Sequence, residues 1–309
     1  MNDIRFYTPA YIPPEISAYE ADLLQLEPGK PGKIGALALK LEENPQTKKT
    51  VITDQFSRVP LFTQKALYME ESYPSMAYVY IMTPSGGILQ GDRNRIDLTL
   101  SNRAQVHVTT QGATRIYRME KNYASQIVNI NVGENCYLEY IPDQIIPYKN
   151  SRFYQTVNAK VHDSGTLVYS EMLTPGRVAS DEAFQYDILY MTTQATNQDG
   201  KLRFIDAYVL EPKKVGLHKI GLLGEYVVVG NLYSLTKPGY NKQLIQEISK
   251  CLKSFSTIEA GVTLLPNDSG TVARILGKTA DEVKAVIFEA LSIIRKTIIG
   301  APFSGIRKY

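Results

Sequence analysis

Short runs in which hydrophobic and polar residues alternate fill the chain from about residue 35 to residue 235, and turn residues separate them. The runs are rich in Val, Ile, Thr and Tyr, whose branched and aromatic side chains pack well on a pleated sheet. The clearest alternating runs are Ala36–Leu41, Arg95–Leu100, Gln105–Thr110 and Gln126–Val132. Met76–Met82 is apolar on both faces, which indicates a strand that is covered on both sides. No stretch of this region has a helical period, so the pattern predicts a large β domain.

Two polar segments within this region have the composition of tight turns. Asp163-Ser164-Gly165 and Asp199-Gly200 each end in glycine, which adopts positive φ without steric cost. Both segments are therefore predicted to close β-hairpins.

The pattern changes after about residue 224. Glu225–Leu235 is predicted to be one more strand. An apolar residue at every third or fourth position then predicts a helix from Asn241, its expected N-cap, to about Phe255. Thr257–Leu265 and Thr271–Leu276 are predicted to pair as a hairpin.

A second helix is predicted over residues 280–298. Thr279, followed three residues later by Glu282, has the spacing of a capping box at its start. Gly277-Lys278-Thr279 imitates the end of a phosphate-binding loop, but Val272 stands where that loop needs a glycine. The chain is therefore not expected to bind a nucleoside triphosphate by itself.

These elements together predict a mainly β fold. A large multi-stranded β domain with layered sheets is followed by a C-terminal β-α-β-β-α module, with the two main helices near 241–255 and 280–298. We expect the β-rich domain to span residues 1–224 and the α+β module residues 225–309, packed together as one continuous domain.

Charge and composition exclude several classes of protein. The 309 residues include 34 Lys and Arg against 31 Asp and Glu, a net charge of +3 that indicates neither a nucleic-acid partner nor a membrane partner. Three His and two Cys are too few for a tight site of soft metal ligands or for a disulfide framework. Met1–Tyr19 lacks the apolar run of a signal peptide, so we expect a cytoplasmic protein.

Several acids stand inside apolar or turn segments, where an unpaired buried charge is costly. Asp92 ends the segment Gly86–Asp92, whose glycines allow close backbone approach and would place this carboxylate beside main chain. Glu139 and Asp143 lie in Leu138–Gln144, where an acid alternates with aromatic and aliphatic residues before a proline. Each of these acids needs either a partner side chain or a cation.

Two further acids, Glu171 and Glu182, flank a Pro-Gly turn and Arg177. The three side chains are the right types for an internal ion-pair network. A cation bound by the acids is the other interpretation, and the residues alone leave both open.

Taken in chain order, these segments resemble the urease accessory protein family UreD, also called UreH. The resemblance depends on GGILQGD at 86–92, TTQGATRIYR at 109–118, LEYIPDQIIPY at 138–148, EMLTPGR at 171–177 and DEAF at 181–184. Val59-Pro60-Leu61 and the terminal Ile306–Tyr309 also fit the family pattern. The matches cover about residues 35–309.

The resemblance implies a non-catalytic assembly factor that helps to insert nickel into apo-urease, in a complex with UreF and the GTPase UreG. It also implies a mainly β fold with an internal passage, lined by polar and acidic side chains, as the nickel route. No cofactor is expected to bind tightly, because carboxylates hold nickel less well than imidazole and thiolate do and so suit transient passage of Ni²⁺. The expected nickel-passage residues are Asp92, Glu171 and Asp206, with Glu139, Asp143 and Glu182 as secondary candidates.

The residues by themselves leave two other functions open. A β-rich hydrolase could use Asp92 and Glu171 as acid and base, provided that the two carboxyl groups lie ~5–10 Å apart. A β-rich binding module would need no metal at all.

Overall fold

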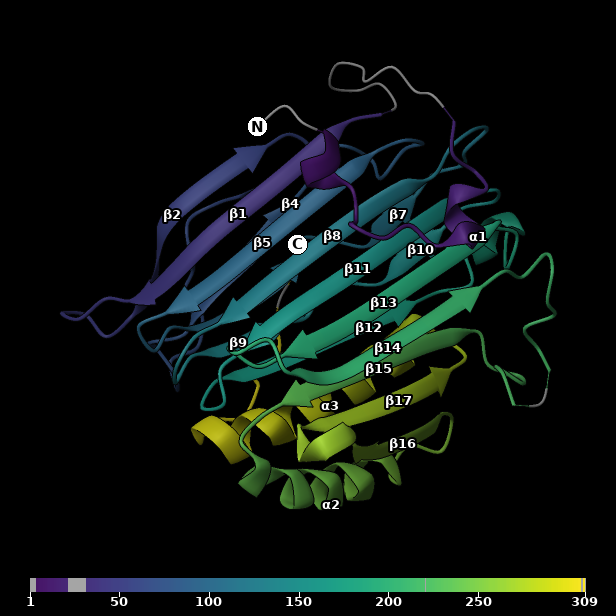
Figure 1. Cartoon of the computed structure of the whole chain (residues 1–309). Helices are drawn as coiled ribbons and strands as arrows, with labels where there is room; N and C mark the ends of the chain where they lie inside the picture. The colour runs from purple at the N-terminus through teal and green to yellow at the C-terminus, as the bar shows by residue number, and fades with distance from the viewer. Residues whose placement is uncertain (1–3, 22–31, 220, 307, 309) are drawn as a thin grey trace.

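Two large β-sheets lie face to face in the computed structural model, which describes residues 4–21, 32–219, 221–306 and 308 (Figure 1). Within these residues sheet A has seven strands in the order β14-β13-β11-β8-β5-β1-β2. Its strands are β1 (Ile34–Glu43), β2 (Thr50–Arg58), β5 (Arg93–Ser101), β8 (Ala124–Val132), β11 (Arg152–Val161), β13 (Ile188–Thr196) and β14 (Leu202–Leu210).

Sheet B has ten strands in the described residues, most of them in the order β16-β17-β15-β12-β9-β6-β4-β3. The strands on this path are β3 (Phe62–Thr63), β4 (Ala77–Met82), β6 (Gln105–Thr110), β9 (Tyr137–Tyr140), β12 (Thr166–Leu173), β15 (Val228–Leu235), β16 (Glu259–Leu264) and β17 (Thr271–Gly277). The short β10 (Ile145–Pro147) pairs with β12 and with β7 (Thr114–Ile116) beside this path. The predicted mainly β fold with layered sheets is confirmed.

Successive strands of the chain alternate between the two sheets, as in a β-solenoid. The chain passes from β4 in sheet B to β5 in sheet A, back to β6, and on in the same way to β13, so that neighbouring strands of this part run parallel. Parallel neighbours need a crossover, and here a strand of the opposite sheet supplies it in place of a helix. The predicted hairpin at Asp163-Ser164-Gly165 is therefore wrong, because this turn joins β11 to β12 in different sheets. The one at Asp199-Gly200 is confirmed, since it joins the antiparallel pair β13 and β14.

The main hydrophobic core lies between the sheets, where the apolar positions of the alternating strands meet. Leu37, Ile96 and Val128 of sheet A face Val79 and Val106 of sheet B in one buried cluster. The opposite face of β4 packs in a second cluster beneath the C-terminal helices. This explains why its sequence is apolar on both faces, as predicted.

Helices α2 (Asn241–Leu252) and α3 (Ala280–Ile299) cover the outer face of sheet B, in the predicted β-α-β-β-α order. A capping box of Thr279 and Glu282 begins α3, as predicted. Asn241 does not cap α2: Tyr240 holds that position, and the Asn241 side-chain oxygen accepts from the Thr236 hydroxyl while its amide donates to Asp268. β15 pairs with β12 as well as with β17, so the C-terminal strands continue sheet B. The division of the chain at residues 224 and 225 stays a prediction.

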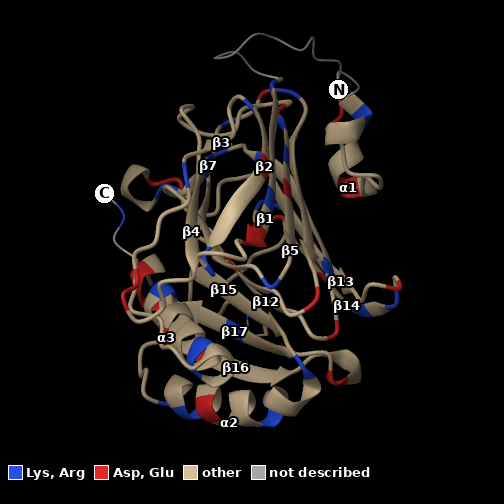
Figure 2. Ribbon diagram, turned by 90° about the vertical axis from the view of Figure 1, so that its left-hand side faces the viewer, with Lys and Arg blue, Asp and Glu red and all other residues tan. Residues whose placement is uncertain are grey.

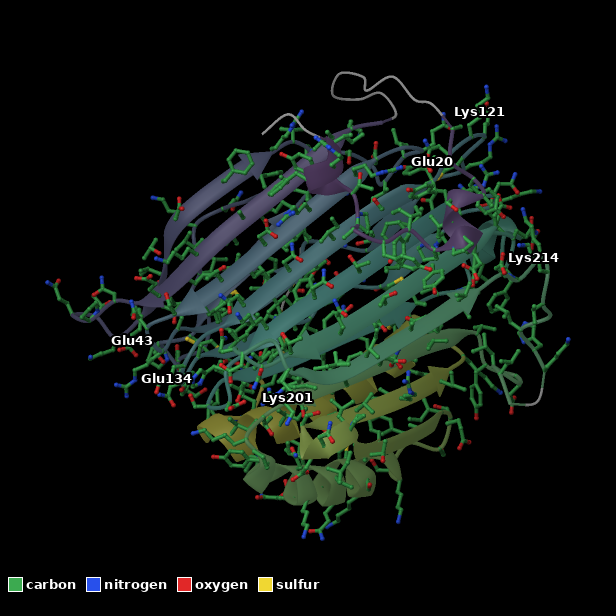
Figure 3. All side chains as sticks on the ribbon, in the orientation of Figure 1. Glu20, Glu43, Lys121, Glu134, Lys201 and Lys214 are labelled. Atoms are coloured by element: carbon green, nitrogen blue, oxygen red, sulfur yellow. The ribbon has the colours of Figure 1, made fainter. Side chains whose placement is uncertain are left out.

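The two ends of the chain pack on opposite outer faces of the molecule (Figure 2). Near the N-terminus, the short helices η1 (Ile4–Tyr7) and α1 (Pro14–Ser17) lie on sheet A, where Ile16 is fully buried. The C-terminal tail lies on the side of sheet B, although Arg307 and Tyr309 of its family motif fall outside the described residues. Turn residues such as Glu134 and Lys201 place charges at the ends of the sheet A strands (Figure 3). In the part of the chain that the structure describes, no helix has the length and hydropathy to cross a membrane.

Candidate functional site

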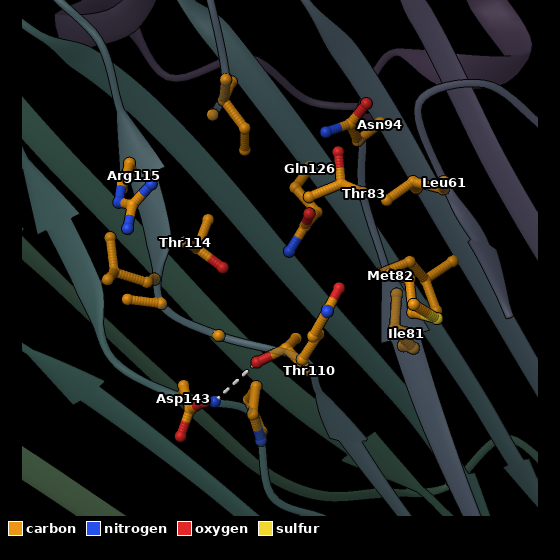
Figure 4. Close-up of a pocket in the computed structure, with 18 of the residues that line it drawn as sticks. Leu61, Ile81, Met82, Thr83, Asn94, Thr110, Thr114, Arg115, Gln126 and Asp143 are labelled. Atoms are coloured by element: carbon orange, nitrogen blue, oxygen red, sulfur yellow. Dashed lines mark hydrogen bonds between the residues drawn. The ribbon is translucent and has the colours of Figure 1, made fainter. Parts of the chain in front are cut away.

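A cavity of about 290 Å³ lies between the two sheets, where β4 ends and β5 begins (Figure 4). Asn94, Gln126 and Gln155 line it from three neighbouring strands of sheet A, whose register places Asn94 beside Gln126 and Gln126 beside Gln155. Each of these polar residues points inward, because it stands two positions before a core residue of its own strand. Those core residues are Ile96, Val128 and Val157. The apolar alternation thus gives way to amide side chains at one level of the sheet.

A chain of hydrogen bonds leads from this cavity across the space between the sheets. Gln126 Nε2 donates to Gln155 Oε1 at 2.9 Å, and Gln155 Nε2 donates to the Tyr169 hydroxyl at 3.4 Å. Tyr169 in turn donates to Glu171 Oε2 at 3.0 Å. On the far side of Glu171, the Tyr233 hydroxyl lies 3.4 Å from Glu171 Oε1 and 2.7 Å from an Asp206 oxygen. The structure therefore connects two of the predicted acids, Glu171 and Asp206, through one polar chain.

Glu171 is buried at the centre of this chain of hydrogen bonds, with 3% of its surface exposed. Besides Tyr169, Asn231 and Tyr208 donate to its carboxylate at 2.9 and 3.0 Å. In the described part of the chain, no cationic side chain forms an ion pair with it. Burial raises the pKa of Glu171, and the charge of nearby Asp206 raises it further. A carboxylate held by neutral donors in this way is a place where a passing cation would be stabilised.

Asp206, on β14, is the last residue of this chain of hydrogen bonds and lies nearer to solvent than Glu171. It accepts from the Tyr233 hydroxyl and forms an ion pair with Arg274, whose Nη2 lies 2.5 Å from Asp206 Oδ2. Arg274 also donates to Asn231 at 3.1 Å. A cation that reached Asp206 would have to compete with this guanidinium.

Asp92 takes no part in this chain of hydrogen bonds. It lies in a buried turn beside the cavity. Its two oxygens accept from the backbone amides of Lys33 and Leu89 at 2.8 and 2.9 Å, which confirms the expected position beside main chain. The Lys33 ammonium is 3.9 Å away. Gly87 of the same turn lines the cavity, and a Cβ there would lie 2.5 Å from the Arg115 carbonyl oxygen. Asp92 thus fixes the turn that closes one side of the cavity.

Glu139 faces away from the cavity, toward the C-terminal helices. It accepts from Arg295, which is fully buried, and from His107 Nδ1 at 2.6 Å. Burial alone would raise the pKa of Glu139, but these hydrogen bonds lower it to about 2. This acid therefore has the partner that its apolar surroundings require.

The remaining secondary candidates, Asp143 and Glu182, are both ion-paired. Asp143 lines the cavity and bonds to the ammonium groups of Lys284 and Lys308 at 3.1 and 2.8 Å. Glu182 accepts two hydrogen bonds from Arg177 at the surface, at 2.8 and 2.5 Å. Of the ion-pair network left open by the sequence, only the Arg177–Glu182 pair forms, because Glu171 instead accepts from Tyr169, Tyr208 and Asn231.

Six residues of the polar chain escaped the sequence analysis: Gln126, Gln155, Tyr169, Tyr208, Asn231 and Tyr233. A signal for them existed, since each stands at an inward position of its alternating strand. The pattern was informative only once the strands were paired, because a polar residue in a single strand also fits a solvent-facing position.

Comparison with known proteins identifies the family. The family model described as UreD urease accessory protein matches residues 33–308. Urease accessory protein UreD of Cenarchaeum symbiosum (strain A) is 41% identical over 284 residues, which cover 92% of this chain and 99% of that protein. UreD 2 of Brucella suis is 38% identical, over 93% and 95% of the two chains, and UreD of Photorhabdus laumondii is 36% identical, over 93% and 89%. The chain therefore belongs to the UreD urease accessory protein family, whose members are non-catalytic proteins of urease maturation.

Proposed function

We propose that this protein helps to insert nickel into apo-urease, as part of a hetero-oligomeric complex with UreF and the GTPase UreG. We further propose that nickel passes through it along the polar chain between the sheets. Membership of the UreD family supports the role in maturation. The observation that supports the route is Glu171, a buried carboxylate on a chain that starts at a cavity and has no cationic partner among the described residues.

The donors along this route suit an ion that must be released again. They are carboxylate, phenol and amide groups, and nickel binds these less tightly than imidazole or thiolate. Asn94 also lines the cavity, and its amide is a further neutral, weakly binding group on the route. Weak, spaced oxygen ligands favour transfer over storage.

The acids divide into two groups under this proposal. Glu171 and Asp206 lie on the route, and Asp143 lies at the cavity wall. The other three candidates neither line the cavity nor join the hydrogen-bond network of Glu171, so we assign them structural roles: Asp92 in its turn, Glu139 on Arg295, and Glu182 on Arg177.

The partner proteins supply what this chain does not. Gly277-Lys278-Thr279 is occupied in capping α3, where the Thr279 hydroxyl accepts from the Glu282 amide. Nucleotide hydrolysis in the complex is therefore assigned to the separate GTPase, UreG. UreF and apo-urease are the other partners that the family resemblance implies.

We propose that the protein acts in the cytoplasm. Cys136 and Cys251 are both free thiols, as is usual for proteins of a reducing compartment.

The route is tested by Glu171→Gln, which removes the charge and keeps the size of the side chain. In a urease-positive host that carries E171Q as its sole copy, we expect the nickel content and activity of urease to fall by about tenfold, the lower end of the effects usual for changes around a metal ligand. Metal analysis of purified urease measures this. Co-purification with UreF and UreG should be unchanged, because Glu171 is buried.

The matched control is Glu182→Gln, the same chemical change in a surface ion pair with Arg177. We expect this variant to activate urease normally. Full activation by E171Q, or an equal loss in E182Q, would remove Glu171 from the route.

A further inference from the structure

Arg274 stands at the outer end of the chain of hydrogen bonds that runs from the cavity to Asp206. Its strand, β17, lies between β15 and β16, which is the edge strand of sheet B among the described residues (Figure 1). The register places Arg274 between Asn231 of β15 and Gly261 of β16. Side chains at directly opposite positions of antiparallel strands point to the same face. The three positions therefore form one row, from a member of the hydrogen-bond chain to a glycine at the edge of the sheet.

The guanidinium of Arg274 is linked to two acids of the proposed route, to one directly and to the other through an amide. Its Nη2 pairs with Asp206 Oδ2 at 2.5 Å, and its Nη1 donates to Asn231 Oδ1 at 3.1 Å. Asn231 is buried, and its Nδ2 donates to Glu171 at 2.9 Å. Arg274 therefore places a positive charge at the outer end of the route and also fixes the orientation of the amide that faces Glu171.

The ion pair between Arg274 and Asp206 is open to water on the arginine side. The Arg274 side chain is 54% exposed, and that of Asp206 is 18% exposed. An ion pair with one exposed partner is screened by water and contributes little to stability. The long arginine side chain can therefore leave Asp206 by a change of rotamer, at little cost to the fold.

Gly261 leaves space for that movement. A Cβ at this position would meet no atom within 4 Å. On the other side of Arg274, the buried Asn231 already fills the row. Within the row, the guanidinium therefore has its open direction away from Asn231 and over Gly261.

We propose that Arg274 is the gate of this chain of hydrogen bonds. Paired with Asp206, its guanidinium closes the outer end of the route to cations, and swung over Gly261 it opens that end. The reason is electrostatic, because the guanidinium and a passing cation repel each other and are attracted to the same carboxylate. The inference rests on the proposed route through Glu171 and adds to it the residue that controls passage.

Gly261→Leu tests the gate by filling the space into which Arg274 swings. In a urease-positive host that carries G261L as its sole copy, we expect the nickel content of purified urease to fall by about tenfold, as for E171Q, because a locked gate interrupts the same route. Thr263→Leu is the matched control, since Thr263 is exposed on the same face of β16 but stands opposite Val272. T263L should load urease normally, and an equal loss in both variants would overturn the proposal.

Arg274→Met added to G261L separates a locked gate from a structural effect of the leucine. With methionine at this position no guanidinium remains to be locked onto Asp206. We therefore expect G261L/R274M to recover the nickel content of urease that G261L loses, whereas a structural effect of the leucine would persist in the double variant. A nickel content as low as that with G261L alone would overturn the gate.

The movement of Arg274 can also be measured without urease, by ¹⁵N NMR relaxation of the arginine Nε–H groups in the purified full-length chain. We expect a higher order parameter for Arg274 Nε–H in G261L than in the wild type or T263L, because the leucine confines the side chain. Equal order parameters in G261L and the wild type would overturn the gate.

Failure of the gate and failure of the route give different results. If E171Q lowers the nickel content of urease and G261L does not, the gate is wrong and the route stands. If E171Q loads urease normally, the route is wrong and the gate is wrong with it.

Discussion

Two buried acids of sheet B show how far the surroundings of a single residue decide its chemistry. Glu139 and Glu171 are both almost inaccessible, and each lies in a strand that is buried along its whole length. Arg295 bonds to Glu139 and lowers its pKa to about 2, whereas Glu171 has only neutral donors and a raised pKa. The same residue type is therefore a structural ion in one position and an uncompensated charge in the other. Glu171 also lies apart from the Asp92 network, and the paired-carboxylate hydrolase is wrong for this family of non-catalytic proteins.

The raised pKa of Glu171 predicts a dependence of stability on pH. A pKa raised by folding means that the charged form is less stable in the native state, so the native state loses stability as pH rises through the ordinary and then the raised pKa. Glu171→Gln removes this loss. We expect E171Q to be more stable than the wild type at about pH 8 and no more stable at about pH 4, in urea titrations.

Glu182→Gln is the control, because Arg177 lowers the pKa of Glu182 and its stabilisation grows with pH instead. Lower stability of E171Q at high pH would show that Glu171 is compensated in the native state. If E171Q is as stable as the wild type, a loss of urease activation in this variant reflects lost function and not unfolding.

Among the elements, the contact between α3 and sheet B depends on Gly230 of β15. A Cβ at this position would lie 2.5 Å from Val283 Cγ1 on the buried face of the helix. We expect Gly230→Ala to lower the free energy of unfolding by about 1–3 kcal/mol, the usual cost of overpacking a core. Chemical denaturation measures this change.

Gly261 of β16 gives a matched comparison, because a Cβ there would meet nothing within 4 Å. Gly261→Ala should change the unfolding free energy by less than about 0.5 kcal/mol. Equal effects of the two substitutions would mean that α3 and β15 are not in close contact.

At the scale of the whole molecule, strands alternate between two sheets in a solenoid-like arrangement, and the C-terminal elements pack along one side of it. β15 pairs with β12 of this arrangement, and Val168 and Met172 of β12 pack in the same cluster as Val283 of α3. The C-terminal module therefore shares both a sheet and a core with the rest of the chain. We propose that residues 1–224 and 225–309 form one cooperative unit.

Expression of residues 225–309 alone tests this proposal. We expect no cooperative thermal unfolding, because the isolated module would expose an edge of β15 and part of the apolar face of α3. Circular dichroism as a function of temperature measures it. A sharp, monomeric transition would instead show an independent domain.

Local features of the fold could be predicted from the sequence, and its winding could not. The alternating strands, the two helices and the Thr279 capping box each depend on neighbours in the chain. The turn at Asp163-Ser164-Gly165 looks like a hairpin because glycine permits the reversal, but the sheet that the next strand joins depends on distant strands. Asn241 likewise has the right residue type for a cap, but in the fold its side-chain oxygen accepts from Thr236 and its amide donates to the distant Asp268.

For the site, the sequence by itself indicated that Asp92, Glu139 and Glu171 need a partner, because an acid inside an apolar segment cannot stay unpaired without cost; all three are buried, whereas the buried Glu70 escaped notice. The sequence could not say what each acid meets. The solenoid-like arrangement places Glu171 beside Tyr233 and Asp206, and it sets Glu139 against Arg295, partners that lie far away in the chain. Only the tertiary structure decides these contacts, because pairing across sheets and helices brings together side chains that no local pattern connects.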